Sequence, residues 1–246
     1  MQKREEAFTV KTYHCRPDGR MKIDALMRRL QEAAAAHAQQ AGFSLDWLKE
    51  IGCYFVLSNF IVEFGRLPGW NEVVALRTWP SGHNRVITTR EFVGCDAGGS
   101  ELFRVGSEWM VLSRKTNRPR NLAKLDLPLT SEAEKVIPEK VIAGPLERLV
   151  PLADYGFTES IRVPYSAVDM NGHVNNTEYV RWGMDVLRRG LDFNSDVRRL
   201  QITYLSEVFE NDRLDVAVAM AGPGRYAVAG RKADEGTLVY LMEIVC

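Results

Sequence analysis

The chain carries two successive rounds of one hydrophobic pattern, a helical stretch followed by several strand-like stretches. In the first round, apolar residues recur at three- and four-residue spacing from Met21 to Ala41, which predicts one long helix ending near Gly42. Runs rich in β-branched and aromatic residues predict strands at residues 6–14, 54–64, 72–78, 86–94 and 101–113. Turn-forming clusters separate the runs, one of them at residues 80–84. The first round therefore predicts a long helix with an antiparallel meander.

The second round repeats this order. A helix is predicted to start at Asn175 or Asn176, because asparagine is a good N-cap before the apolar spacing that follows. The strands predicted after it are residues 199–205, 213–220, 225–232 and 237–245. In this repeat Asp18-Gly19 matches Asn171-Gly172, Leu26 falls opposite Tyr179, and residues 68–73 correspond to residues 209–214.

Residues 114–155 interrupt the pattern with five prolines and many charges, and they are predicted to cross between two units. A short helix is expected near Ser131 to Val136. The predicted organisation is an N-terminal unit at 1–125, a linker at 126–155 and a C-terminal unit at 156–246. The fold class is α+β, with a curved antiparallel sheet wrapping a long helix in each unit.

Composition narrows the function classes. The 246 residues include 32 basic and 32 acidic ones, so the zero net charge gives no general attraction to nucleic acid. Four cysteines without CxxC or metal-type spacing are expected to be free thiols, and neither a metal nor a cofactor is expected. The N-terminus lacks a secretory apolar core and no apolar run spans a bilayer, so a cytoplasmic protein without membrane insertion is expected.

Candidate chemistry concentrates in residues 163–182, V-P-Y-S-A-V-D-M-N-G-H-V-N-N-T-E-Y-V-R-W. Asp169, Asn171 and His173 occupy alternate positions, which in an extended segment would place their side chains on one face. They precede the predicted helix start, where free backbone N–H groups favour an oxyanion or a carboxylate. Asp169 or Asn171 alone is equally well explained as turn or cap chemistry. The joint pattern D-x-N-x-H-V-N-N followed by Y-x-x-W is much harder to explain that way.

This stretch resembles the active-site segment of the fatty acyl-acyl carrier protein (acyl-ACP) thioesterases, which usually contain two hotdog units in one chain. Further similarity lies in Glu72–Trp79, in Arg114–Arg120 and in Thr203–Glu207, so the resemblance covers most of the sequence. The shorter form G-H-V-N-N-x-x-Y also occurs in single-hotdog acyl-CoA thioesterases. The resemblance therefore implies a double, or tandem, hotdog and a thioester hydrolase.

The resemblance also implies a catalytic set of Asp169, Asn171, His173 and Glu207. Asp169 would attack the thioester or orient water, Asn171 would hold Asp169, water or the carbonyl, and His173 would donate to the thioester oxygen or shuttle a proton. Glu207 would orient His173 or activate water. The backbone amides expected to serve the oxyanion are those of Gly172, Val174 and Asn175.

Two features qualify the family pattern. Some plant members carry a cysteine directly after the glutamate, but this chain has Val208 there, so a thiol nucleophile is not expected. The first unit lacks the polar set, so catalysis is expected in the second unit and acyl-chain binding in the first. Apolar residues that could line an acyl tunnel, or simply form the core, are Leu26, Leu30, Ala33, Phe55 and Leu57.

The function implied is hydrolysis of acyl-ACP to free fatty acid and ACP, which ends fatty acid synthesis. An acyl-CoA thioesterase and a non-catalytic acyl-binding hotdog protein are the alternatives. The partner implied is an acidic acyl carrier protein, and a homodimer is also allowed. Basic clusters that could meet such a partner, or could simply be solvated, are Arg28-Arg29, Arg114-Lys115, Arg118, Arg120, Arg188-Arg189 and Arg198-Arg199.

Overall fold

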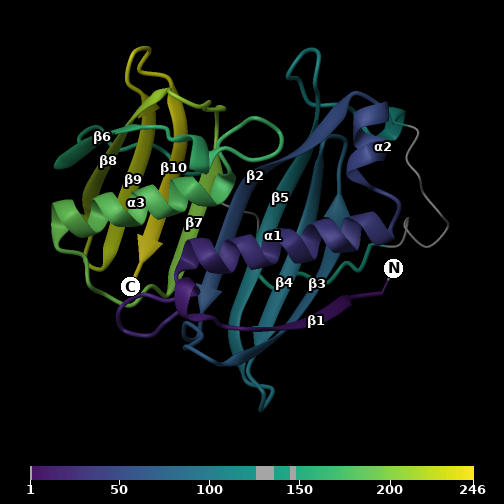
Figure 1. Cartoon of the computed structure of the whole chain (residues 1–246), viewed down its shortest axis with the longest axis horizontal. Helices are drawn as coiled ribbons and strands as arrows, with labels where there is room; N and C mark the ends of the chain where they lie inside the picture. The colour runs from purple at the N-terminus through teal and green to yellow at the C-terminus, as the bar shows by residue number, and fades with distance from the viewer. Residues whose placement is uncertain (1, 126–135, 145–147) are drawn as a thin grey trace. The chain divides into compact units, whose positions relative to one another are not determined.

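The computed structural model describes residues 2–125, 136–144 and 148–246, and the chain folds into two compact units, Met1–Gly144 and Pro145–Cys246. Figure 1 shows a long helix lying across the sheet in each unit. Residues 131–135 of the expected short linker helix lie outside the described part of the chain. In the described residues, no helix is long and apolar enough to span a membrane.

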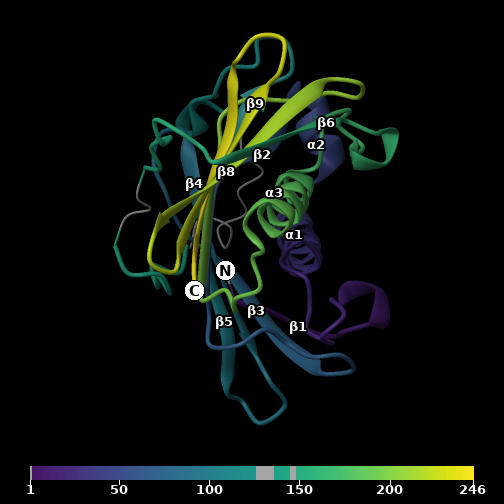
Figure 2. The same cartoon turned by 90° about the vertical axis from the view of Figure 1, so that its left-hand side faces the viewer.

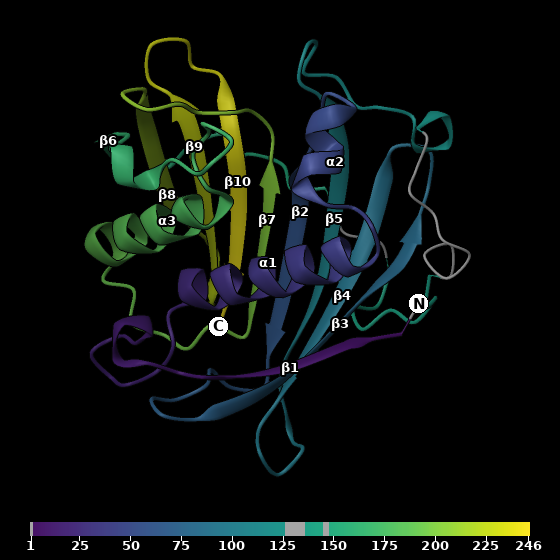
Figure 3. The ribbon, with the colours of Figure 1, turned by 45° about the vertical axis from the view of Figure 1, so that its right-hand side comes forward.

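The described residues of the first unit form strands in the order β1-β3-β4-β5-β2, and neighbouring strands run antiparallel. In Figure 3, α1 crosses in front of these strands. The sheet elements are β1 (Arg4–Thr9), β2 (Cys53–Phe64), β3 (Val73–His83), β4 (Ile87–Cys95) and β5 (Glu101–Ser113). The helical elements are the 3-10 turns η1 (Thr12–His14) and η2 (Leu122–Lys124) and the helices α1 (Ile23–Gln40) and α2 (Leu45–Glu50).

The long helix α1 forms where the apolar spacing predicts it. Its buried face is the predicted one, running from Ile23 through Leu26, Leu30 and Ala33 to His37. Gly42, directly after the C-cap Ala41, takes a φ of 91°, a conformation that glycine adopts at low cost. The six-residue α2 was not predicted, because it is too short to show a helical period.

The second unit repeats the arrangement with the sheet order β7-β10-β9-β8-β6. Helix α3 contacts β6, β8, β9 and β10, and Figure 2 views it nearly along its axis beside them. The elements are β6 (Phe157–Arg162), η3 (Tyr165–Ala167), α3 (Asn176–Leu191), β7 (Arg199–Tyr204), β8 (Arg213–Gly222), β9 (Arg225–Lys232) and β10 (Leu238–Val245). The α+β double hotdog class is thereby confirmed.

One predicted turn was wrong. Residues 80–83 continue β3, and a register shift between Pro80 and Gly82 absorbs the irregularity against β4. Proline supplies no ladder hydrogen bond and glycine tolerates unusual backbone angles, so the dipeptides that suggested a turn mark a β-bulge instead. Trp79 is fully buried on this strand and donates its indole N–H to the Glu139 carbonyl at 2.9 Å.

The two units share a backbone hydrogen-bond pattern at the turn before β3 and before β8. The Asn71 amide donates to the Val10 carbonyl at 2.9 Å, and the Asn211 amide donates to the Val163 carbonyl at 3.0 Å. Both asparagines have positive φ, 63° and 70°. Asn71 therefore corresponds to Asn211.

This correspondence corrects the predicted repeat by one residue, because it places Pro68 opposite Val208 rather than opposite Phe209. The paired bonds agree: the Met21 amide donates to the Pro68 carbonyl at 2.8 Å and the Val174 amide to the Val208 carbonyl at 3.0 Å. The prediction aligned the two units by the composition of their strands. It did not use the positive-φ asparagine of each turn, a residue that adopts the left-handed conformation more readily than most, to fix the alignment.

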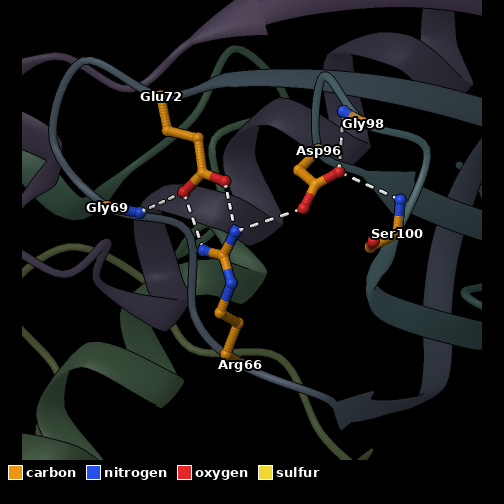
Figure 4. A network of polar contacts seen from close by, with 6 residues as sticks. All are labelled: Arg66, Gly69, Glu72, Asp96, Gly98 and Ser100. Atoms are coloured by element: carbon orange, nitrogen blue, oxygen red, sulfur yellow. Dashed lines mark hydrogen bonds and ion pairs between the residues drawn. The ribbon is translucent and has the colours of Figure 1, made fainter.

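A network of ion pairs holds this turn in the first unit (Figure 4). Glu72 accepts two hydrogen bonds from Arg66, at 2.6 and 2.8 Å, and one from the Gly69 amide at 2.8 Å. Asp96 lies 3.5 Å from the same guanidinium. Hydrogen bonding from Arg66 lowers the pKa of Glu72. In the second unit, Asp212 takes the place of Glu72 and accepts from the Phe209 amide at 3.0 Å.

Candidate active site

Asp169, Asn171 and His173 lie in a tight turn rather than in the extended segment that was predicted. The turn is closed by the Asp169 amide donating to the His173 carbonyl at 2.8 Å and by the Gly172 amide donating to the Asp169 carbonyl at 2.9 Å. Gly172 has a φ of 82°, which explains the glycine at this position. Asp169 Oδ1 accepts the Asn171 amide at 2.8 Å, so the carboxylate has a fixed orientation.

The turn leads directly into α3, whose first helical residue is Asn176 as predicted. Asn175 is the N-cap, and its side-chain oxygen accepts the Thr177 amide at 3.1 Å and the Thr177 hydroxyl at 2.8 Å. The sequence Asn-Asn-Thr thus sets the start of the helix within one residue. As a result, the polar turn lies at the positive end of the α3 dipole.

His173 and Glu207 come together from different parts of the second unit. His173 Nδ1 lies 3.6 Å from Glu207 Oε1, and both side chains are about three-quarters shielded, at 24% and 23% exposure. This separation is slightly longer than a hydrogen bond, and such catalytic contacts often shorten when substrate binds. The pair has the composition of a carboxylate-oriented imidazole, which can move a proton near neutral pH.

Tyr179 lies on the first turns of α3, within electrostatic range of the same carboxylates. Burial raises its pKa, and the negative charges of Glu207, Asp169 and Asp212 raise it further. The two predicted catalytic carboxylates are therefore close enough to act electrostatically on one phenol. The structure brings His173 and Glu207 to within 3.6 Å and places Asp169 and Asn171 in the turn that ends at His173.

All three backbone amides expected to serve an oxyanion are engaged within the fold. The Gly172 amide closes the turn, the Val174 amide donates to the Val208 carbonyl at 3.0 Å, and the Asn175 amide donates to the Ala167 carbonyl at 2.9 Å. These bonds fix the shape of the loop.

Phe209 was missed by the sequence reasoning. Its ring packs edge-on against the His173 imidazole, with 5.1 Å between ring centroids, although 42% of the residue is exposed. Lys232 Nζ lies over the Phe209 ring, 5.8 Å from the ring centroid. An exposed aromatic residue in a turn carries no sequence signal for such a role, because its partner is 36 positions away in the chain.

The equivalent turn of the first unit has the same backbone and different chemistry. The Arg16 amide donates to the Arg20 carbonyl at 2.8 Å and the Gly19 amide to the Arg16 carbonyl at 3.0 Å, so Arg16 and Arg20 occupy the places of Asp169 and His173. Asp18, in the place of Asn171, pairs with Arg16 at 2.7 Å. Leu67 stands where Glu207 does. The described residues of the whole chain contain no cluster of three or more His, Cys, Asp or Glu side chains that could bind a metal ion.

Two units of this kind, one carrying an acid-amide-imidazole turn at the N-terminus of its long helix, define the class of double-hotdog proteins. Residues 1–125 match the acyl-ACP thioesterase N-terminal domain and residues 153–237 match the acyl-ACP thioesterase C-terminal domain. The chain belongs to the acyl-ACP thioesterase family.

Individual relatives agree with this assignment. Oleoyl-acyl carrier protein thioesterase 2, chloroplastic, of Arabidopsis thaliana is 25% identical over 86% of this chain and 61% of its own length. The corresponding Coriandrum sativum enzyme is 24% identical over 96% of this chain and 71% of its own length. The chain thus spans about three fifths to seven tenths of these plant proteins.

Solved structures share the fold along the whole chain. An acyl-ACP thioesterase from Bacteroides thetaiotaomicron superimposes with a TM-score of 0.85 at 23% identity, covering 99% of this chain and 97% of that one. The 12:0-ACP thioesterase from Umbellularia californica gives a TM-score of 0.87 at 21% identity, covering 99% and 96%. At these identities the likeness concerns the fold.

Proposed function

We propose that this chain hydrolyses the thioester of fatty acyl-ACP, releasing a free fatty acid and the carrier thiol and so ending fatty acid synthesis. The strongest support is the 3.6 Å approach of His173 to Glu207 beside the Asp169 turn, in the unit that matches the family's C-terminal domain. Catalysis is accordingly assigned to Asp169, Asn171, His173 and Glu207.

Two routes use these groups. In the first, water attacks the thioester carbon, its proton passes to the His173–Glu207 pair, and the imidazolium returns a proton to the departing thiolate. In the second, the Asp169 carboxylate attacks and forms an acyl-aspartyl anhydride as the thiolate leaves and takes a proton from His173; water then cleaves the anhydride. Both routes create an oxyanion that the Asn171 amide or the His173 N–H can stabilise.

The acyl chain is assigned to the first unit. Supporting residues are those that face the sheet from α1, because Leu26, Leu30 and Ala33 are all almost fully buried and none carries a polar group. Ala33 is the most useful probe, since enlarging its side chain would narrow the space between helix and sheet. Ala33→Leu should shift hydrolysis toward shorter acyl chains without changing kcat on the shortest one.

Binding of the carrier protein is assigned to the basic turn at residues 114–120, which is exposed throughout. Its backbone is ordered: the Asn117 amide donates to the Ser113 carbonyl at 2.8 Å and the Ser113 amide to the Arg118 carbonyl at 3.0 Å. Within the described residues, no ion pair involves Lys115, Arg118 or Arg120. An acidic partner would therefore meet cations that are held in place and not already neutralised.

The test is hydrolysis of a panel of acyl-ACP and acyl-CoA thioesters of several chain lengths, with His173→Ala protein as the matched blank. We expect a much higher kcat/KM on acyl-ACP than on the same acyl group carried by CoA. Preference for CoA would replace the carrier assignment with the acyl-CoA alternative. Acyl binding without hydrolysis of any thioester would identify a non-catalytic binder instead.

A further inference from the structure

Phe209 is an exposed aromatic residue whose ring contacts the imidazole of His173. The two ring centroids are 5.1 Å apart and the ring planes cross at 74°, an edge-on geometry that aromatic pairs favour. Because 42% of Phe209 is exposed, burial of its ring contributes little to the core of the unit. Core packing therefore does not account for a large aromatic side chain at this position.

The turn that carries Phe209 also forms without an aromatic ring. In the second unit, the Phe209 amide donates to Asp212 Oδ2 at 3.0 Å, and the Asp212 amide donates to the Phe209 carbonyl at 3.2 Å. In the first unit, the Gly69 amide donates to Glu72 Oε2 at 2.8 Å, and the Glu72 amide donates to the Gly69 carbonyl at 3.1 Å. Since Gly69 occupies the place of Phe209, the ring is not required to close the turn.

The first unit lacks the imidazole as well as the phenyl ring, because Arg20 stands in the place of His173. The backbone does not require a glycine at position 69. Gly69 does not take a positive φ, and a Cβ there would lie 3.8 Å from Glu72 Oε2, an ordinary contact distance. The aromatic ring is thus present in the unit that has the imidazole and absent from the unit that does not.

Phe209 and Glu207 reach His173 from one short segment. Glu207 Oε1 lies 3.6 Å from His173 Nδ1, and Phe209, two residues later, places its ring against the same imidazole. Between them, the Val208 carbonyl accepts the Val174 amide at 3.0 Å, which ties the segment to the residue next to His173. Val208 is fully buried, so this bond is shielded from water. One anchored tripeptide therefore brings both a carboxylate and an aromatic ring to the imidazole.

Asp212 and Lys232 restrain Phe209. Lys232 Nζ lies 5.8 Å from the centroid of the Phe209 ring, within the range of a cation–π contact. The same ammonium lies 3.6 Å from Asp212 Oδ2, the atom that also accepts the Phe209 amide. The backbone of Phe209 is thus fixed by Asp212, and its ring is covered by a cation that Asp212 also holds.

We propose that Phe209 is a positioning residue for the hydrolysis: its ring restricts rotation of the His173 imidazole and keeps Nδ1 directed at Glu207. This inference rests on the proposed function for its catalytic consequence. The outer torsion of a histidine side chain is broad, so an unsupported imidazole would spend part of its time with Nδ1 turned away from the carboxylate. A misaligned proton-transfer group costs rate. Phe209 acts through His173 and is not assigned contact with the reacting atoms.

The first test compares Phe209→Ala, which removes the ring, with Phe209→Tyr, which keeps one. The matched control is Trp70→Ala, which removes an aromatic residue, 64% exposed, from the corresponding turn of the first unit. We expect Phe209→Ala to lower kcat about threefold to tenfold with KM changed less than about twofold, the size of effect that one aromatic contact supports. Phe209→Tyr and Trp70→Ala should both stay within about twofold of the wild type.

Phe209→Ala should fold, because the equivalent turn of the first unit closes around Gly69. Wild-type kcat in Phe209→Ala would overturn the proposal, as would an equal loss in Phe209→Tyr or in Trp70→Ala. A raised KM with unchanged kcat would also overturn it, since that result would make Phe209 a substrate contact.

A double-variant cycle separates positioning from a general effect on the loop. If the ring serves to direct the imidazole at Glu207, adding Phe209→Ala to a Glu207→Ala protein should cause little further loss of kcat. Full additivity of the two losses would overturn the proposal, because the ring would then serve something other than the His173–Glu207 pair.

Nuclear magnetic resonance relaxation of the His173 ring tests the restraint without any substrate. We expect lower order parameters for the imidazole in Phe209→Ala than in the wild type, Phe209→Tyr and Trp70→Ala. Unchanged order parameters in Phe209→Ala would overturn the proposal. If the wild type hydrolyses no thioester but the imidazole shows the expected pattern, the proposed function fails while the inferred restraint stands.

Discussion

The two units differ more in single side chains than in backbone conformation. The turns at residues 16–20 and 169–173 close with the same pair of backbone hydrogen bonds, yet one presents Arg16 and Arg20 where the other presents Asp169 and His173. The first unit can therefore serve as a control for the second: a substitution at equivalent positions should affect folding similarly and catalysis very differently.

Replacing the acid or the imidazole should abolish most of the activity. Asp169→Asn keeps an oxygen that can accept the Asn171 amide, and His173 is partly exposed, so neither Asp169→Asn nor His173→Ala should unfold the protein. We expect kcat to fall about a hundredfold to ten-thousandfold, the usual contribution of proton-transfer groups. Arg20→Ala, the counterpart of His173→Ala, should keep near-wild-type activity. Turnover that survives in either site variant would refute the assignment of that residue.

Removing every thiol should leave the enzyme active. Cys53 is fully buried among Leu48, Val111 and Leu122, so it is best changed to alanine, while the other three cysteines can be changed to serine. Burial raises the pKa of Cys246, which disfavours a reactive thiolate. We expect kcat within about twofold of the wild type for the folded quadruple variant, because the proposed nucleophile is water or the Asp169 carboxylate and not a thiol. Complete inactivity of the folded variant would restore a cysteine mechanism.

For single residues, the sequence predicts the features that depend only on neighbouring positions in the chain. Asn175 as N-cap follows from the capping preference of asparagine, and the structure confirms it. The occupied amides of Val174 and Asn175 could not be predicted, because their acceptors belong to residues brought together only by folding. The same holds for the edge of Phe209 on His173.

Elements with a long, uninterrupted period were predicted well. The helices α1 and α3 follow from residue spacing, and the strands β2 and β5 follow from their β-branched and aromatic residues, because each of these elements is long enough to show its pattern. The bulge in β3 and the one-residue correction between the units were missed for a different reason. Both depend on the pairing of neighbouring strands, and composition alone does not fix pairing register.

One element carries a pH-dependent contact. His37, 4% exposed on α1, accepts a hydrogen bond from Arg90 at its Nδ1, 3.1 Å away, and Arg90 also donates to Thr78 at 3.2 Å. Burial, with Arg90 and Arg4 nearby, lowers the pKa of His37 to about 4. The imidazole is therefore neutral in the folded protein at pH values where the unfolded chain already binds a proton.

This lowered pKa predicts that His37 destabilises the fold as pH decreases. The stability that it contributes is fully present above pH 6.5 and is lost as the pH falls from there toward 4, with a slope of up to about 1.4 kcal/mol per pH unit. His37→Asn keeps an acceptor near Nδ1 but cannot titrate. Its melting temperature should therefore fall less than that of the wild type between pH 7 and 5, and His83→Asn controls for loss of an exposed imidazole. Parallel curves for the wild type and His37→Asn would contradict this account.

For the whole molecule, the proposed function gives the two units different roles. The second unit holds the side chains proposed for catalysis, whereas the first combines a buried apolar helix face with the exposed basic turn at residues 114–120. Such a division of labour assigns chemistry to one unit and recognition of the acyl chain and carrier to the other. Because each assignment concerns a different unit, the two can be tested separately.

Charge reversal in the basic turn should weaken carrier recognition without touching the chemistry. Lys115→Glu, Arg118→Glu and Arg120→Glu together should raise KM for acyl-ACP about tenfold or more at low salt, and added salt should reduce the difference from the wild type. The value of kcat, and kcat/KM on a small acyl thioester, should change little, since the reacting bond is the same.

The matched comparison is Arg189→Glu, because Arg189 is already committed to Glu159 through two hydrogen bonds of 2.8 and 2.9 Å. Breaking that surface pair should cost at most about 1 kcal/mol of stability and leave KM for acyl-ACP unchanged. If instead Arg189→Glu raises KM and the triple reversal does not, the carrier docks on the second unit. Equal effects of the triple reversal on acyl-ACP and on the small thioester would mean that the basic turn acts on folding or turnover rather than on the carrier.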